Sequence, residues 1–123
     1  MNAGAVYKSF LTPLSFIERS AAVYPDKVAI VHRDRRYTYR EFGERVNRFA
    51  SALRKNGLAK GDRVAVLLPN IPSMLEAHFA VLLAGGMIVP INTRLSAGEI
   101  EYILEHSGST FLFADTEFAD LVR

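Results

Sequence analysis

The stretch that decides the fold is residues 81–114, VLLAGGMIVPINTRLSAGEIEYILEHSGSTFLFA. It begins within an apolar helix that ends at Gly85-Gly86, and a short apolar strand from Met87 to Ile91 follows. A polar loop then leads into a helix that starts with a Ser96/Glu99 capping box, and another apolar strand closes the stretch. Because helices that alternate with strands are typical of parallel sheets with right-handed crossovers, the stretch predicts an α/β unit.

The residues on either side continue this pattern. The remaining predicted elements are a helix over 12–23, strands over 28–31 and 36–39, a helix from a Thr38/Glu41 capping box to Gly57, a strand over 63–68, a helix over 72–84, and a helix that begins after Asp115. The two short strands flank a turn at 33–35 and form a hairpin. We therefore expect an α/β fold, a parallel-strand unit with an N-terminal hairpin, in a single unit over residues 1–123.

Two helices carry further information. The helix after Thr38 has the pairs Glu41/Arg45 and Glu44/Arg48 on its polar side, where opposite charges four residues apart support a helix weakly. The helix over 72–84 is apolar around almost its whole circumference, so it is predicted to be buried on more than one side. Because one layer of sheet covers only one side, we expect self-association through this helix.

Composition excludes several classes of function. The chain has 123 residues, of which 50% are hydrophobic and 23% charged, with a net charge of +2 and no cysteines. The arginines are interleaved with acids and no nucleic-acid motif accompanies them, so no nucleic-acid partner is expected. The longest apolar run, 79–91, is too short to span a bilayer and is broken by glycine and proline. The lack of cysteines fits a reducing cytoplasm.

Motifs for catalysis or metal binding are missing. The three histidines do not have metal-ligand spacing, Gly85-Gly86 is followed by no phosphate-binding lysine, and no GxSxG elbow occurs. We therefore expect no catalytic residue and no metal site here. One loop, Asn92-Thr93-Arg94-Leu95, follows the carboxyl end of a predicted parallel strand, where open α/β sheets bind ligands. The alternative is an ordinary loop with a solvated arginine.

The ordered set of motifs resembles the adenylate-forming (AMP-binding) enzymes, in particular acyl-CoA synthetases of the acid–CoA ligase type. The matching motifs are YPDKVAIV, RRYTYREF, GLAKGDRVAVLLPNIPSMLEAHFAVLLAGGMIVPIN and RLSAGEIEYILEHSGSTFLFAD, over about residues 11–118. The resemblance implies that the chain is the first part of the large N-terminal domain of an ATP-dependent ligase. Such a ligase joins a fatty or aryl acid to ATP, forms an acyl-adenylate, and passes the acyl group to coenzyme A.

The family's phosphate loop, its magnesium-positioning acid, its ribose-binding aspartate and its catalytic lysine match no position here. The resemblance therefore implies that ATP, magnesium and coenzyme A serve the complete enzyme, that none binds this chain alone, and that the chain alone is inactive. Its partner would be the rest of the ligase chain. Arg94 matches a position from which some acid–CoA ligases contact the phosphates of coenzyme A.

Two other functions stay open. The chain could be a free-standing, non-catalytic interaction module or remnant, or it could belong to a peptide-synthetase-type adenylation domain, which uses a different acceptor thiol. The acid that the enzyme activates cannot be named, because the family's acyl pocket is built from residues beyond the matching motifs.

Overall fold

The computed structural model describes residues 10–123, so the first nine residues of the expected unit lie outside the described part. Its elements follow the predicted order. They are α1 (Pro13–Val23), β1 (Val28–His32), β2 (Arg35–Thr38), α2 (Tyr39–Lys55), β3 (Arg63–Leu67), α3 (Pro72–Leu83), β4 (Met87–Pro90), α4 (Ala97–Ser107), β5 (Phe111–Ala114) and a 3₁₀ helix, η1 (Thr116–Leu121).

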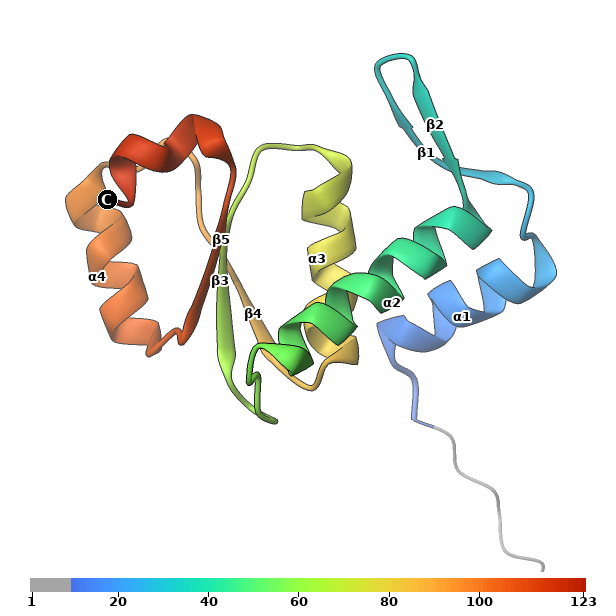
Figure 1. Ribbon diagram of the computed structural model, residues 1–123, viewed down its shortest axis with the longest axis horizontal. Coiled ribbons are helices and arrows are strands. Elements are labelled where there is room, and N and C mark those ends of the chain that lie inside the picture. The colour runs from blue at the N-terminus through green and yellow to red at the C-terminus, as the bar shows by residue number, and fades with distance from the viewer. Residues whose placement is uncertain (1–9) are drawn as a thin grey trace, which may run out of the picture.

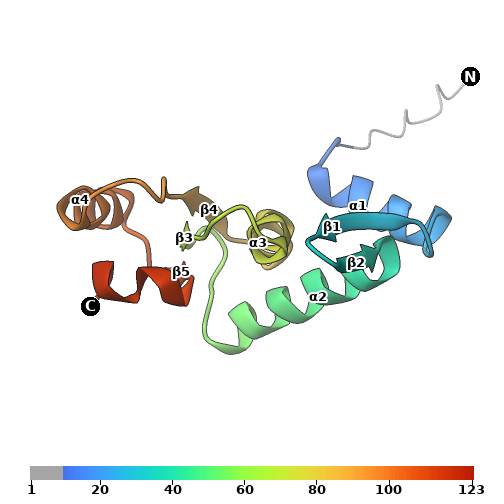
Figure 2. The ribbon, with the colours of Figure 1, turned by 90° about the horizontal axis from the view of Figure 1, so that it is seen from above.

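Two sheets organise the chain. Strands β4, β3 and β5 form a parallel sheet in that order, and β1 and β2 form a separate antiparallel hairpin. Helix α3 lies on one face of the parallel sheet, with α2 beside it, while α4 and η1 lie on the opposite face (Figures 1 and 2). The hairpin extends from the end of α2 that is remote from this sheet (Figure 1). The predicted α/β fold is confirmed.

Both faces of the central strand β3 are buried. Val64 and Val66 pack with Leu53, Ala77 and Val81 on the side of α2 and α3. On the other face, a second cluster joins the side chains of β3 to those around α4, namely Ala65, Leu67, Ile91 and Ile100. A strand covered on both sides needs a continuous apolar run, which is the sequence pattern that predicted it.

Helix α3 is also covered on two sides, and both covers come from this chain. One side faces the parallel sheet through Ala77 and Val81. The other side joins a cluster shared by α1, the hairpin and α2, which contains Ile17, Ile30, Phe42, Val46, Ala50 and Ala80. We expected self-association to cover this second side, because one layer of sheet covers only one side of a helix. Of the large apolar side chains of α3, Leu75 stays 42% exposed.

The predicted caps are present. Thr38 and Glu41 form a reciprocal capping box at the start of α2, and Ser96 and Glu99 form another at the start of α4. Hydrogen bonds from the backbone N–H of Ser96 and from its hydroxyl hold the pKa of Glu99 below its usual value. Within residues 10–123, no helix is long and apolar enough to cross a membrane.

Element boundaries differ slightly from the predicted ones. The hairpin turn is shorter than expected, since Arg35 already belongs to β2, and β2 ends at Thr38 because Thr38 caps α2. The helix expected after Asp115 is a 3₁₀ helix, which Asp115 caps by accepting a hydrogen bond from the backbone N–H of Glu117 at 3.0 Å.

Candidate functional site

The loops after the parallel strands meet at one edge of the sheet. The first residue after β4 is fixed by the hydrogen bond from the Ile91 N–H to the Val66 carbonyl, at 2.9 Å. The first residue after β5 is fixed in the same way, by the bond from the Asp115 N–H to the Leu67 carbonyl at 3.0 Å. Because carboxyl ends of parallel strands are where open α/β sheets bind ligands, this edge is a candidate site.

Arg94 lies in the turn between β4 and α4 at this edge. Its backbone N–H donates to the side-chain oxygen Oδ1 of Asn92 at 3.0 Å, which fixes the turn that carries it. The residue is exposed, and its guanidinium has no ion pair or hydrogen bond with the described residues. The five donors of this group are therefore available to an anionic ligand such as a phosphate.

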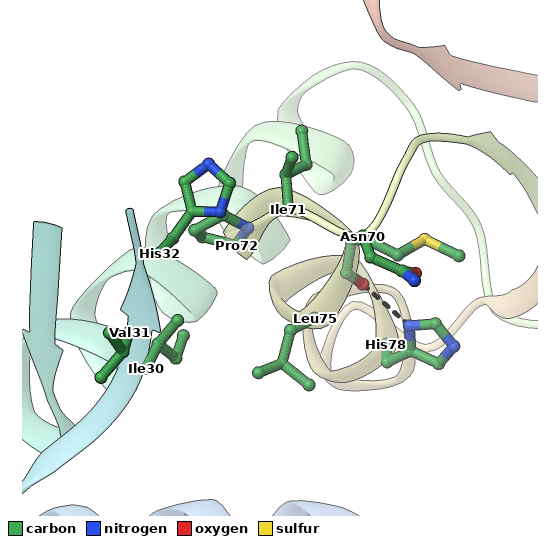
Figure 3. Close-up of a pocket in the computed structure, with 9 residues that line it drawn as sticks. Ile30, Val31, His32, Asn70, Ile71, Pro72, Leu75 and His78 are labelled. Atoms are coloured by element: carbon green, nitrogen blue, oxygen red, sulfur yellow. Dashed lines mark hydrogen bonds between the residues drawn. The ribbon is translucent and has the colours of Figure 1, made fainter. Parts of the chain in front are cut away.

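A groove of about 360 Å³ opens between the hairpin and the N-terminal half of α3 (Figure 3). One wall is formed by three consecutive residues of β1, and the other by the loop before α3 and its first two turns. The lining residues are Ile30, Val31, His32, Asn70, Ile71, Pro72, Met74, Leu75 and His78. Apart from the two histidines and Asn70, the lining is apolar, so the groove suits an apolar occupant.

Two of the three histidines, His78 and His106, make contacts that indicate structural roles. Nδ1 of His78 lies 2.8 Å from the Met74 carbonyl, which can only accept, so Nδ1 carries the proton (Figure 3). His106 stacks on Tyr102 with ring centroids 5.5 Å apart, in the last turn of α4. Within the described residues, no three His, Cys, Asp or Glu side chains are grouped so that they could hold a metal ion.

An ion pair between α2 and α3 was missed by the sequence analysis. Arg45 donates to both carboxylate oxygens of Glu76, with Nη2 3.2 Å from Oε2. The side chain of Glu76 is only 6% exposed, and that of Arg45 is 41% exposed. The hydrogen bond to Glu76 raises the pKa of Arg45 above its usual value, and the guanidinium carbon of Arg45 also lies 5.1 Å from the ring centre of Tyr37.

This pair replaces the expected one between Glu41 and Arg45. Glu41 is occupied by the capping box, where its carboxylate accepts from the Thr38 N–H at 2.7 Å. The other expected pair, Glu44 with Arg48, is present at 3.7 Å on the surface. The only signal for the buried pair was a single carboxylate, Glu76, in a mostly apolar helix, because a buried carboxylate needs a partner.

Comparison with known proteins identifies the family. The AMP-binding enzyme family matches residues 17–122, which is most of the chain. The chain belongs to the AMP-binding enzymes. The chain is 46% identical over 110 residues to 4-hydroxybutyrate–CoA ligase 2 of Metallosphaera sedula. The alignment covers 89% of this chain and 20% of that protein.

Solved structures of other proteins share the fold. The fatty acyl CoA synthetase of Mycobacterium tuberculosis matches with a TM-score of 0.85 and 36% identity, over 89% of this chain and 22% of that one. An artificially fused adenylation–PCP di-domain NRPS from Klebsiella oxytoca matches with a TM-score of 0.79 and 28% identity, over 85% of this chain and 20% of that one. The chain thus spans about a fifth of the length of the curated relatives.

Proposed function

We propose that this chain is the N-terminal part of an ATP-dependent acid–CoA ligase and that it forms a single unit over residues 1–123. The reaction of the complete enzyme would convert a carboxylic acid and ATP to an acyl-adenylate and pyrophosphate, after which the thiol of coenzyme A displaces AMP. The observation that carries this proposal is the continuous match over residues 17–122 to the AMP-binding enzymes, with 46% identity to a CoA ligase. ATP, magnesium and coenzyme A are the cofactors, and the cytoplasm is the proposed location.

The 123 residues alone are proposed to be inactive. The family resemblance implies that the phosphate loop and the catalytic lysine of the complete enzyme follow the matched segment. Stabilisation of charge on the transferring group is usually the largest catalytic contribution. The chain alone should therefore support no pyrophosphate exchange with a panel of carboxylic acids. Exchange above the buffer background that survives repurification would contradict this.

A chimera tests the proposed function directly. The matched segment of 4-hydroxybutyrate–CoA ligase 2 from Metallosphaera sedula is replaced by this chain, and pyrophosphate exchange and acyl-CoA formation are both measured. We expect the chimera to form acyl-CoA, because 46% identity preserves the surfaces on which the remainder packs. A folded chimera that forms no adenylate would favour a free-standing interaction module instead.

Arg94 is proposed to contact a phosphate of coenzyme A. Its guanidinium is exposed at the carboxyl edge of the sheet, without a partner among the described residues. Losing a charge-assisted hydrogen bond costs about 1.5–3 kcal/mol, which corresponds to a rise of about tenfold to a hundredfold in the KM for coenzyme A. The Arg94→Ala chimera should show this rise with adenylate formation unchanged.

Arg19→Ala is the matched control for Arg94→Ala, because Arg19 is an exposed arginine on α1. It should leave the KM for coenzyme A unchanged. An equal loss of adenylation and thioester formation in Arg94→Ala, or a lower melting temperature, would assign Arg94 to the fold instead.

A peptide-synthetase-type adenylation domain is the second candidate. It is supported by the similarity to the Klebsiella di-domain, although the identity of 28% is below the 46% and 36% found with the CoA ligase and the acyl-CoA synthetase. The acceptor distinguishes the two functions. The chimera should transfer the acyl group to free coenzyme A, whereas a requirement for a carrier protein would favour this second candidate.

A further inference from the structure

We infer that the outer edge of β1, together with the groove beside it, binds an extended segment of the ligase chain from outside these 123 residues, as a third strand of the hairpin sheet. The inference rests on the proposed function, because it takes the occupant from the remainder of that enzyme. To the proposed function it adds a binding surface on this chain, the way in which the occupant pairs with it, and the chemistry of that occupant.

The backbone of β1 is open along one side. Its only strand partner is β2, and among residues 10–123 no backbone group of Val28–His32 forms a hydrogen bond outside the hairpin. A two-stranded hairpin is marginally stable without further cover, and a row of unpaired N–H and C=O groups is a template for another strand.

The groove follows this open edge. Ile30, Val31 and His32 are consecutive in β1, so their side chains alternate between the two faces of the strand, yet all three line the groove. The groove therefore lies alongside the strand and not over one face of it. Figure 3 shows β1 between β2 and the first turns of α3, with Leu75 facing the strand across the open space.

Large apolar side chains at the groove remain in contact with water. Val31 is 57% exposed and Leu75 is 42% exposed. A strand that pairs with β1 would lie over both, and its alternate side chains would enter the groove, as in other cases of strand addition to a sheet edge. The occupant is therefore an extended segment with apolar residues at every second position.

Two of the other open edges, those of β2 and β4, are less suited to an apolar strand. The outer edge of β2 carries Arg35 and Arg36, and charges on an edge strand oppose pairing. Strand β4 ends in Pro90, which has no N–H to donate. The outer edge of β5 carries Leu112 and Phe113, which are 38% and 40% exposed, and the cleft beside Phe113 is also lined by Phe49, Ser73 and the charged residues Arg45, Arg48 and Glu76.

The length of the relatives identifies the source of the occupant. This chain covers about 20% of the curated relatives cited above, so most of the length of such a ligase lies outside the matched segment and can supply a strand to this edge. An intramolecular strand also pairs at high effective concentration, which offsets the ordering entropy that a separate peptide would lose.

Hydrogen exchange tests the inference without requiring turnover. Amide exchange of the peptide that contains Val28–His32 is measured by mass spectrometry in this chain alone and in the chimera with 4-hydroxybutyrate–CoA ligase 2. We expect exchange to be about tenfold slower or more in the chimera, because newly bonded amides exchange only through opening. Unchanged exchange overturns the inference, and so does protection in the chain alone that rises with its concentration, which would assign the edge to a second copy.

A matched pair of substitutions tests the groove. Val31→Lys places a charge at the proposed pairing surface, and Val23→Lys does so at a residue of α1 that is 52% exposed and outside the groove. Val31→Lys should lower the Tm of the chimera by several degrees, whereas Val23→Lys should not, and neither should destabilise the chain alone. Equal effects of the two in the chimera overturn the inference.

The activity of the chimera and the exchange at β1 report separately on the two proposals. An inactive chimera with a protected β1 rejects the ligase function but keeps the strand pairing. An active chimera with an unprotected β1 keeps the ligase function but rejects the strand pairing.

Discussion

Replacing Arg45 should destabilise this chain far more than its partly exposed position suggests. Arg45→Met leaves the Glu76 carboxylate, whose side chain is 6% exposed, without its partner. Breaking a buried pair in this way costs about 3–5 kcal/mol. Because the Arg45 side chain is itself 41% exposed, water screens part of the interaction. We therefore expect a loss of about 2–3 kcal/mol in the free energy of unfolding.

The two partners should differ in their effect. In Glu76→Gln the amide keeps the shape of the side chain, and Arg45 can turn its guanidinium to water, so the cost should be about 1 kcal/mol. The double variant Arg45→Met/Glu76→Met should recover most of the loss seen in Arg45→Met. Replacing a buried ion pair by apolar side chains of similar volume is often neutral, whereas an unpaired buried carboxylate is not.

Urea unfolding at neutral pH, followed by circular dichroism, measures these differences. Arg48→Met is the matched control, because Arg48 is one turn from Arg45 on the same helix and pairs with Glu44 on the surface, at 3.7 Å with side chains 78% and 56% exposed. That control should lose about 0–1 kcal/mol. The reasoning is refuted if Arg45→Met costs no more than Arg48→Met, or if it costs the same as Glu76→Gln.

Three more predictions concern stability and association. Gly108 has φ +62°, and an added Cβ would lie 2.7 Å from Nη2 of Arg63. Gly108→Ala should therefore lower the free energy of unfolding by about 1–2 kcal/mol, as measured in a thermal melt. Gly98 has open space around it, so Gly98→Ala should raise the free energy of unfolding by about 0.5–1 kcal/mol. The pKa of Glu99 is lower in the folded chain than in the unfolded chain, so the ionised carboxylate stabilises the fold at pH values above the unfolded pKa. That stabilisation is lost as the pH falls through the folded pKa of Glu99. Glu99→Gln should therefore lose less stability than the wild type between about pH 5 and pH 3, in urea titrations at each pH. Self-association through residues 72–84 stays a prediction; light scattering should show it, and Leu75→Glu should reduce it, since Leu75 is the exposed large apolar residue of α3. This association is expected through the side chains of α3, so it should leave the amide exchange of β1 unchanged.

Features fixed by neighbours in the sequence could be predicted. The capping boxes need only residues three apart, and Thr38 with Glu41 and Ser96 with Glu99 form them as expected. The continuous apolar run of β3 also identified a strand buried on both faces. The position of Arg94 after a parallel strand placed it at the carboxyl edge of the sheet, where the structure has it.

Features that depend on contacts distant in sequence were missed. Arg45 and Glu76 are 31 residues apart; Arg45 had a simpler local interpretation as half of an i,i+4 pair, and no partner was predicted for Glu76. The second cover of α3 was missed for the same reason. No pattern of neighbouring residues in α1 or the hairpin predicts that Ile17 and Ile30 pack with Ala80 of α3.

Helix α3 links the two proposed sites. Its small residues Ala77 and Ala80 are fully buried in two different clusters, Ala77 in the one against the sheet and Ala80 in the one of α1, α2 and the hairpin. Small side chains allow both neighbours to approach the helix closely, and Glu76 of the same helix is held by Arg45 of α2. A shift of α3 would therefore move the groove at β1 relative to the sheet edge that carries Arg94. Since core packing tolerates few alternative arrangements, strand pairing at β1 in a complete ligase would stabilise the position that α3 has here.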